Sequence, residues 1–116
     1  MEIIKFETEE ELGKIITHKK NAEKLFVIDC GATWCAPCKR FGKFYREFVK
    51  GFNETDTIIF SELDVDKHDE FCKLNEIKSV PTILFVKDAE VIDRLTTGDP
   101  DKFMTTLKKL VLKDSK

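Results

Sequence analysis

The chain has 116 residues, 41% of them hydrophobic and 36% charged, and a formal net charge of −2 at pH 7. This length and composition are typical of one folded domain, residues 1–116, rather than of a disordered chain. The charge argues against nucleic acid as a partner, because phosphate binding needs clustered Lys and Arg, and no run approaches the roughly 20 apolar residues that span a bilayer.

The chain alternates between strand-like and helix-like patterns along its length. Short apolar runs bounded by polar or turn-forming residues predict strands. Apolar residues spaced by three and four predict helices. The strands are expected at residues 2–6, 25–28, 57–64, 82–86 and 90–95, and the helices at about 9–18, 35–52, 68–75 and 100–112.

Two helices are expected to begin at recognisable caps, and two to carry one apolar face. Thr8 followed by Glu11 is a capping-box pattern, and Asp99-Pro100 places an N-cap before a proline in the first helical position. The apolar face of the second helix comprises Cys38, Phe41, Tyr45, Phe48 and Phe52, and that of the last helix comprises Phe103, Met104, Leu107, Leu110 and Val111.

The order of the elements is strand-helix-strand-helix-strand-helix-strand-strand-helix. This alternation predicts an α/β fold with a central mixed β-sheet, parallel at its centre and flanked by helices on both faces.

Reactive residues are concentrated where the strand at 25–28 turns into the following helix, at Trp34-Cys35-Ala36-Pro37-Cys38. The start of a helix offers unpaired N–H groups and a partial positive charge, which stabilise a thiolate. We therefore expect Cys35 to lie exposed in the first turn and to act as the nucleophile. Cys38 should return to the same side of the helix and close a disulfide with it. Pro37 suits this position because its missing N–H costs little there.

Two other interpretations of the cysteine pair remain. It could be half of a zinc site, or two structural thiols in the core. A tetrahedral zinc site normally needs a second pair of ligands, and no such pair is formed by the other Cys and His residues, Cys30, Cys72, His18 and His68. An exposed turn is also a poor place for core-filling thiols. We expect no metal, and we expect Cys30 and Cys72 to be structural or neutral thiols. A regulatory or intermolecular disulfide through Cys72 is the alternative.

Asp29 is an anomaly at the end of an otherwise apolar strand, six residues before Cys35. It could be a carboxylate that water reaches at the sheet edge. The interpretation that we favour is a partly buried acid with a raised pKa that moves a proton to and from Cys38.

Val80-Pro81 precedes the strand at 82–86, where a proline costs no ladder hydrogen bond. An ordinary trans peptide would fit this position. A cis peptide would mark a tight functional turn.

Asp29, the run Trp34-Cys35-Ala36-Pro37-Cys38-Lys39 and Val80-Pro81-Thr82 together resemble the thioredoxin family, and the match in element order covers essentially the whole chain. The segments 32–34 and 60–66 are similar to its eukaryotic cytosolic branch. The bacterial branch usually has a lysine where this chain has Glu62. Two departures from the family pattern are Gly31, where many members have an aromatic residue, and an extra residue near 96–98, beside the substrate groove.

The resemblance implies a thioredoxin fold and a protein-disulfide reductase with attacking Cys35, resolving Cys38 and proton-handling Asp29. It also implies a cis Pro81 facing the disulfide and substrate contacts from Trp34, Pro37, Val80 and Pro81. No cofactor beyond the redox-active disulfide is implied. The alternatives are a disulfide oxidase or isomerase, and a non-catalytic adaptor with the same fold.

The implied partners are disulfide-containing protein substrates and a thioredoxin reductase or an equivalent, with no nucleic acid and no membrane. We expect a monomer. Because no long apolar stretch of a secretion signal follows Met1, we expect the protein to work in the reducing cytoplasm.

Overall fold

The computed structural model describes residues 1–53 and 57–114, in which strands and helices follow the predicted order. The strands are β1 (Ile3–Lys5), β2 (Leu25–Gly31), β3 (Ile58–Asp64), β4 (Thr82–Lys87) and β5 (Glu90–Leu95). The helices are α1 (Glu9–Thr17), α2 (Ala36–Gly51), α3 (Asp69–Leu74) and α4 (Pro100–Asp114), with 3₁₀ turns η1 (Lys19–Asn21) and η2 (Val65–Lys67).

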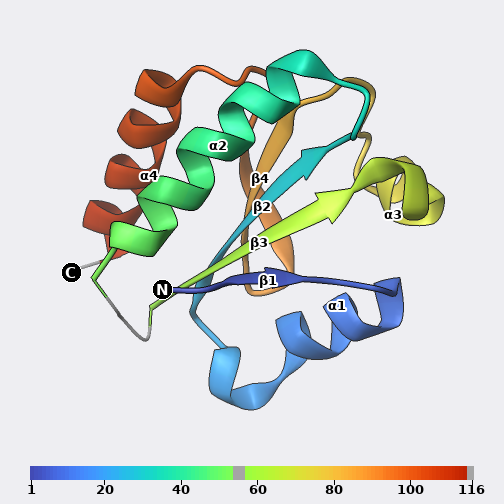
Figure 1. Ribbon diagram of the computed structural model, residues 1–116. Coiled ribbons are helices and arrows are strands. Elements are labelled where there is room, and N and C mark those ends of the chain that lie inside the picture. Colours follow the sequence, from blue (N-terminus) through green and yellow to red (C-terminus); the bar gives the residue numbers. More distant parts are fainter. Residues whose placement is uncertain (54–56, 115–116) are drawn as a thin grey trace.

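The strands form one mixed sheet in the order β1-β3-β2-β4-β5 (Figure 1). Strands β1, β3 and β2 are parallel, whereas β4 runs antiparallel to β2 and β5 antiparallel to β4. The predicted mixed sheet is therefore confirmed. Its parallel part ends at β2, which is the central strand and carries the chain into the region of the cysteine pair.

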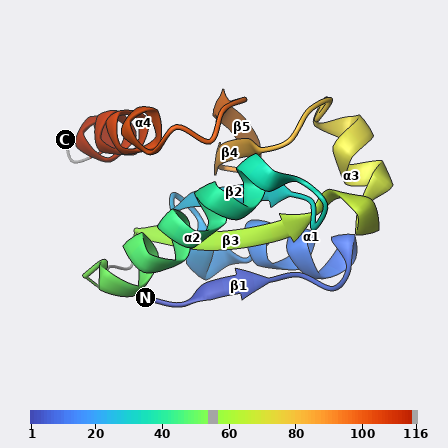
Figure 2. The same ribbon diagram turned by 45° about the horizontal axis from the view of Figure 1, so that its top comes forward.

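Helices cover both faces of the sheet, as predicted (Figures 1 and 2). Successive side chains of a strand point to opposite faces. Leu25 and Val27 of β2 pack with α2 and α4, and Phe26 and Ile28 pack with residues of α1 and α3. The α2 face is rich in aromatic rings, with Phe103 of α4 in edge-to-face contact with several rings of α2. This packing fixes α2 across the sheet and so fixes its N-terminus.

The predicted caps are present. Thr8 Oγ1 accepts the N–H of Glu11 at 3.1 Å, and the carboxylate of Glu11 reaches back to the N–H of Glu7 at 3.3 Å, one residue earlier than a standard capping box. Asp99 Oδ1 accepts the N–H of Asp101 at 2.9 Å at the start of α4. Side-chain acceptors therefore satisfy N–H groups that each helix leaves unpaired.

Two expectations need correction. Met104 is 40% exposed, whereas Phe103, Leu107 and Leu110 are buried. Residue 104 lies about 100° around the helix from Phe103, which turns it off the packed face. In addition, β2 continues to Gly31, so Asp29 lies inside the central strand and not at its end. Its strand neighbours are Glu62 of β3 and Ile83 of β4.

Candidate active site

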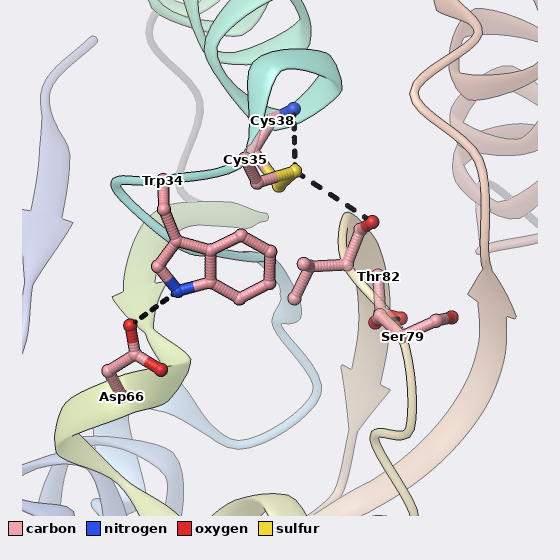
Figure 3. The surroundings of a disulfide bond; sticks show 7 residues. Trp34, Cys35, Cys38, Asp66, Ser79 and Thr82 are labelled. Atoms are coloured by element: carbon pink, nitrogen blue, oxygen red, sulfur yellow. Dashed lines mark hydrogen bonds between the residues drawn. A yellow bond between two sulfur atoms is a disulfide. The ribbon is translucent and has the colours of Figure 1, made fainter.

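The cysteine pair lies at the N-terminus of α2. Cys35 is the N-cap residue and forms a disulfide with Cys38, with 5.2 Å between their Cα atoms. The backbone N–H of Cys38 donates to Cys35 Sγ at 3.2 Å, and the same sulfur lies 3.9 Å from the carbonyl oxygen of Val80 (Figure 3). When the disulfide is reduced, an N–H at the positive end of a helix stabilises a thiolate at position 35.

The prediction that Cys35 is exposed is wrong for this oxidised state. Cys35 is 5% exposed and Cys38 is 8% exposed. Cys35 precedes the first turn rather than lying in it, and both cysteines pack in a small apolar cluster with Ala32, Val65 and Val80. Solvent exposure therefore does not distinguish the two sulfurs. They differ in position, because Cys35 is the N-cap residue of α2 and its sulfur accepts a helix N–H.

The indole of Trp34 forms an exposed wall beside the disulfide. It is 69% exposed, and its Nε1–H donates to Asp66 Oδ2 at 2.9 Å (Figure 3). Asp66 belongs to η2, directly after β3. This contact was not predicted from the sequence, because Trp34 and Asp66 are distant in the chain.

The loop before β4 forms the opposite wall. The Val80–Pro81 peptide is cis, as the resemblance implied, and Pro81 is buried. Thr82 Oγ1 donates to the carbonyl of Ser79 at 2.7 Å and holds the loop to the start of the strand (Figure 3). Trp34 and Val80 are thus brought to the disulfide from segments that are separate in sequence.

Gly98 completes this wall, although the sequence departs from the family pattern nearby. A Cβ at Gly98 would lie 3.1 Å from Phe41 Cβ, 3.3 Å from Pro81 Cγ and 3.5 Å from the carbonyl oxygen of Pro37. Only a residue without a side chain lets the loop before α4 approach α2 and Pro81 so closely.

Asp29 lies on the α2 side of the sheet, like Leu25 and Val27 of the same strand. It is 6% exposed, and among the described residues its Oδ1 has no hydrogen-bond partner. Burial, and next the negative charge of Glu62, raise the pKa of Asp29 from its ordinary value of 3.8 to about 7, while Arg46 acts in the opposite direction. The expectation of a raised pKa agrees with this environment, and the interpretation as a wetted edge carboxylate does not.

Asp29 and Cys38 share one cavity of about 400 Å³, which Gly31 also lines. Asp29 and Gly31 lie two residues apart in β2 and so point to the same face. Cys38 packs over Gly31, since a Cβ at position 31 would lie 3.3 Å from Cys38 Cβ. The missing side chain of Gly31 therefore allows Cys38 to pack close to the backbone of β2 at the wall of this cavity.

The two other cysteines are free thiols with different surroundings. Burial, above all, raises the pKa of Cys30 well above its ordinary value. For Cys72, partial burial and the nearby carboxylates of Asp69, Glu9 and Asp66 raise the pKa. A raised pKa leaves little thiolate near neutrality, so neither thiol resembles a nucleophile.

Within residues 1–53 and 57–114, no group of three or more Cys, His, Asp and Glu side chains is arranged to hold a metal ion. None of the helices in the same residues has the length and apolar character needed to cross a bilayer.

Comparison with known proteins points to one family. The thioredoxin family model matches residues 4–109. The chain is 32% identical to chicken (Gallus gallus) thioredoxin over 93 residues, covering 80% of this chain and 86% of that protein. It is 29% identical to a thioredoxin H-type of rice (Oryza sativa subsp. indica), covering 94% and 87% of the two chains.

The fold agrees with this assignment. The structure of reduced Schistosoma mansoni thioredoxin pre-protein superposes with a TM-score of 0.81 at 28% identity, covering 94% of this chain and 98% of that one. The chain belongs to the thioredoxin family, and it is a thiol-disulfide oxidoreductase that reduces protein disulfides through Cys35 and Cys38.

Proposed function

We propose that Cys35 attacks the substrate disulfide, that Cys38 resolves the mixed disulfide, and that Asp29 carries the proton of Cys38. The observation that carries this proposal is the placement of the Cys35 sulfur at the start of α2, where it accepts the N–H of Cys38 at 3.2 Å. A charged acceptor forms a stronger hydrogen bond than a neutral one, so this contact favours the thiolate over the thiol.

The reaction has two exchange steps. The Cys35 thiolate attacks one sulfur of the substrate disulfide, and the other substrate sulfur leaves as a thiolate and takes up a proton. Cys38 then loses its proton, and its thiolate attacks the Cys35 sulfur of the mixed disulfide. The second substrate sulfur leaves and is protonated, so the substrate gains two electrons and two protons and the enzyme ends as the disulfide.

Asp29 supplies a base for the second step. Its pKa of about 7 lets it exchange a proton near neutral pH. Its carboxyl group and Cys38 line the same cavity, which gives the proton a route between the sulfur and water. A general base works best when its pKa lies near the working pH.

Substrates would bind across the walls described above. Trp34 offers an exposed indole, and the carbonyl of Val80 lies beside the Cys35 sulfur, where the N–H of an extended substrate strand could donate to it. Pro37 and Pro81 both approach the backbone of Gly98 and complete the groove. Main-chain recognition of this kind tolerates many substrate sequences.

The order of attack can be tested with variants that stop the reaction between its steps. With insulin as the probe substrate, Cys38→Ser should accumulate a mixed disulfide through Cys35, whereas Cys35→Ser should not accumulate one. Cys72→Ser is the matched control and should turn over normally. Accumulation through Cys38 in the Cys35→Ser variant, and not through Cys35, would reverse the assignment.

We also propose a thioredoxin reductase or an equivalent as the electron donor, a monomeric state and a cytoplasmic location. The free thiols Cys30 and Cys72 support a reducing compartment, since disulfides persist mainly in oxidising ones. Turnover with a purified reductase, sedimentation at two widely separated protein concentrations and subcellular fractionation test these three points in turn.

A further inference from the structure

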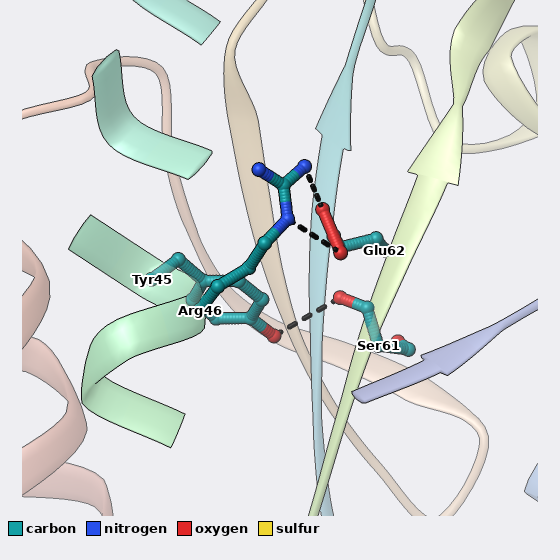
Figure 4. Close-up of polar contacts among 4 residues, drawn as sticks. All are labelled: Tyr45, Arg46, Ser61 and Glu62. Carbon is teal, nitrogen blue, oxygen red and sulfur yellow. Dashed lines mark hydrogen bonds and ion pairs between the residues drawn. The ribbon is translucent and has the colours of Figure 1, made fainter. Parts of the chain in front are cut away.

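An ion pair bridges helix α2 and strand β3 beside the buried acid. Arg46 Nη2 lies 2.7 Å from Glu62 Oε1, and Arg46 Nε lies 3.3 Å from Glu62 Oε2 (Figure 4). This two-point contact matches the planar guanidinium to the carboxylate. The Glu62 side chain is 14% exposed and that of Arg46 is 58% exposed, so the pair lies at the boundary between the cavity and solvent.

The backbone brings Glu62 close to Asp29. The two residues are direct neighbours on the parallel strands β2 and β3. Their side chains therefore point to the same face of the sheet, and both line the cavity that contains Cys38. Two carboxylates so placed oppose each other's ionisation, because a like charge disfavours the charged form.

Gly42 allows the compensating cation to reach this place. It lies one helical turn before Arg46 in α2, and a Cβ at position 42 would lie 3.5 Å from both Nη atoms of the guanidinium. The guanidinium thus lies across the bare backbone of Gly42, on the side that lines the cavity. Below it, the hydroxyl of Tyr45 donates to the carbonyl of Ser61 at 3.0 Å and ties α2 to β3 (Figure 4).

We propose that Arg46 is a positioning residue for the resolving step, because it holds Glu62 in a two-point ion pair and so offsets the negative charge that Glu62 places beside Asp29. This inference rests on the proposed role of Asp29 as the base for Cys38. The other titratable or charged groups around the cavity come from β1 and the loop after it, from α2, from β3 and from η2. They are Lys5, Glu7, Cys38, Lys39, Asp64 and Lys67. Tyr45 of α2 lies beneath the ion pair. The neighbour from β4 is the apolar Ile83.

The directions of the expected effects follow from the charges. Arg46 lowers the pKa of Asp29 and Glu62 raises it. Arg46→Ala should therefore raise the pH at which the resolving step reaches half its maximal rate, and Glu62→Gln should lower it. A change of charge near a carboxyl group shifts its pKa by about one pH unit, so on the acidic side of the profile the rate should change by up to about tenfold.

The test is a single-turnover measurement on the full chain. A mixed disulfide is formed on Cys35 with a chromophoric thiol as the probe, and release of that thiol by Cys38 is followed as a function of pH. Wild type is compared with Arg46→Ala, Arg46→Lys, Glu62→Gln and the double variant Arg46→Ala/Glu62→Gln. The double variant should return close to the wild-type profile, and high salt should shrink the shift of Arg46→Ala, because Arg46 is largely exposed.

Lys109→Ala is the matched control, since it removes another cross-element ion pair, to Asp93 at 3.4 Å. It should leave the profile in place. Arg46→Lys keeps the charge without the two-point contact and should give an intermediate shift. Thermal unfolding of each variant establishes that the shifts occur in folded protein.

Asp29→Asn, measured in the same assay, distinguishes failure of the proposed role of Asp29 from failure of the proposed role of Arg46. If Asp29→Asn slows release and flattens the pH profile while Arg46→Ala and Glu62→Gln leave the wild-type profile unchanged, the inference about Arg46 is overturned and the role of Asp29 stands. If Asp29→Asn itself releases the thiol at the wild-type rate at every pH, the proposed role of Asp29 fails and takes the inference with it. Opposite shifts in the two single variants support the inference.

Discussion

The buried carboxyl group of Asp29 should make the protein lose stability as the pH rises. Burial and the charge of Glu62 raise its pKa from 3.8 to about 7. In the unfolded chain the group titrates near its ordinary value, so between these two pKa values unfolding releases a proton. The stabilising contribution of the protonated group is complete below the unfolded pKa and is lost as the pH rises through the folded pKa. At about 1.36 kcal/mol per pKa unit, the loss amounts to about 4 kcal/mol.

Asp29→Asn removes the ionised form and keeps the shape of the side chain. The variant and the wild type should have similar free energies of unfolding near pH 4, where the aspartic acid is neutral in the folded state. Near pH 8 the variant should be more stable by about 4 kcal/mol, because the wild type must bury a charge. Urea unfolding of the oxidised proteins at a series of pH values measures both free energies. Keeping the disulfide closed removes the titration of Cys35 and Cys38 from the comparison.

Asp93→Asn provides the control, since it replaces an aspartate in a partly exposed ion pair with Lys109. Surface ion pairs contribute little, so this change should alter the free energy of unfolding by less than about 1 kcal/mol at each pH. A stability difference between Asp29→Asn and wild type that does not change with pH would refute the reasoning. It would mean that Asp29 does not ionise in this range in the folded protein.

Three further variants test other parts of the structure. Ala89 has a left-handed backbone conformation, with a φ of 63°, in the two-residue turn between β4 and β5. Because glycine adopts this conformation without a steric penalty, Ala89→Gly should raise the free energy of unfolding by about 1 kcal/mol in urea titrations. Gly98→Ala places a Cβ 3.1 Å from Phe41 Cβ; it should cost about 1–3 kcal/mol of stability and raise the KM for insulin, and an unchanged KM would contradict its place in the groove wall. The double replacement Cys30→Ala/Cys72→Ser should leave insulin turnover largely unchanged, whereas a loss of more than about tenfold in folded protein would show that one of these thiols takes part.

Much of the fold could be read from the sequence because its elements differ in local pattern. Strand and helix patterns are local, because they arise from the spacing of apolar residues along a short segment. Examples are the apolar run at Leu25–Ile28 and the three-four spacing of Phe41, Tyr45 and Phe48. Caps such as Thr8 are equally local. The exposed side of α4 was misjudged at Met104, because which residues at the margin of an apolar face are covered depends on what packs against the helix.

The candidate site divides in the same way. Cys35, Cys38 and Pro37 form one short segment, so the sequence determined their spacing and their position at a helix start. The sequence also singled out Asp29, as a charged residue in an apolar strand, and the family resemblance added the cis peptide before Pro81 and its place facing the disulfide. The burial of Cys35 was not predictable, because it comes from Ala32, Val65 and Val80, which only the packed chain brings together.

The charge environment of Asp29 was decided by tertiary structure alone. Glu62 reaches it through strand pairing between β2 and β3, and Arg46 through the packing of α2 across the sheet. Neither of these contacts can be predicted from local periodicity, because both depend on how segments far apart in the chain pair and pack. A pKa is set by burial and by charges within a few ångströms, so the sequence could nominate Asp29 as an unusual carboxyl group, while the folded chain determined which charges act on it.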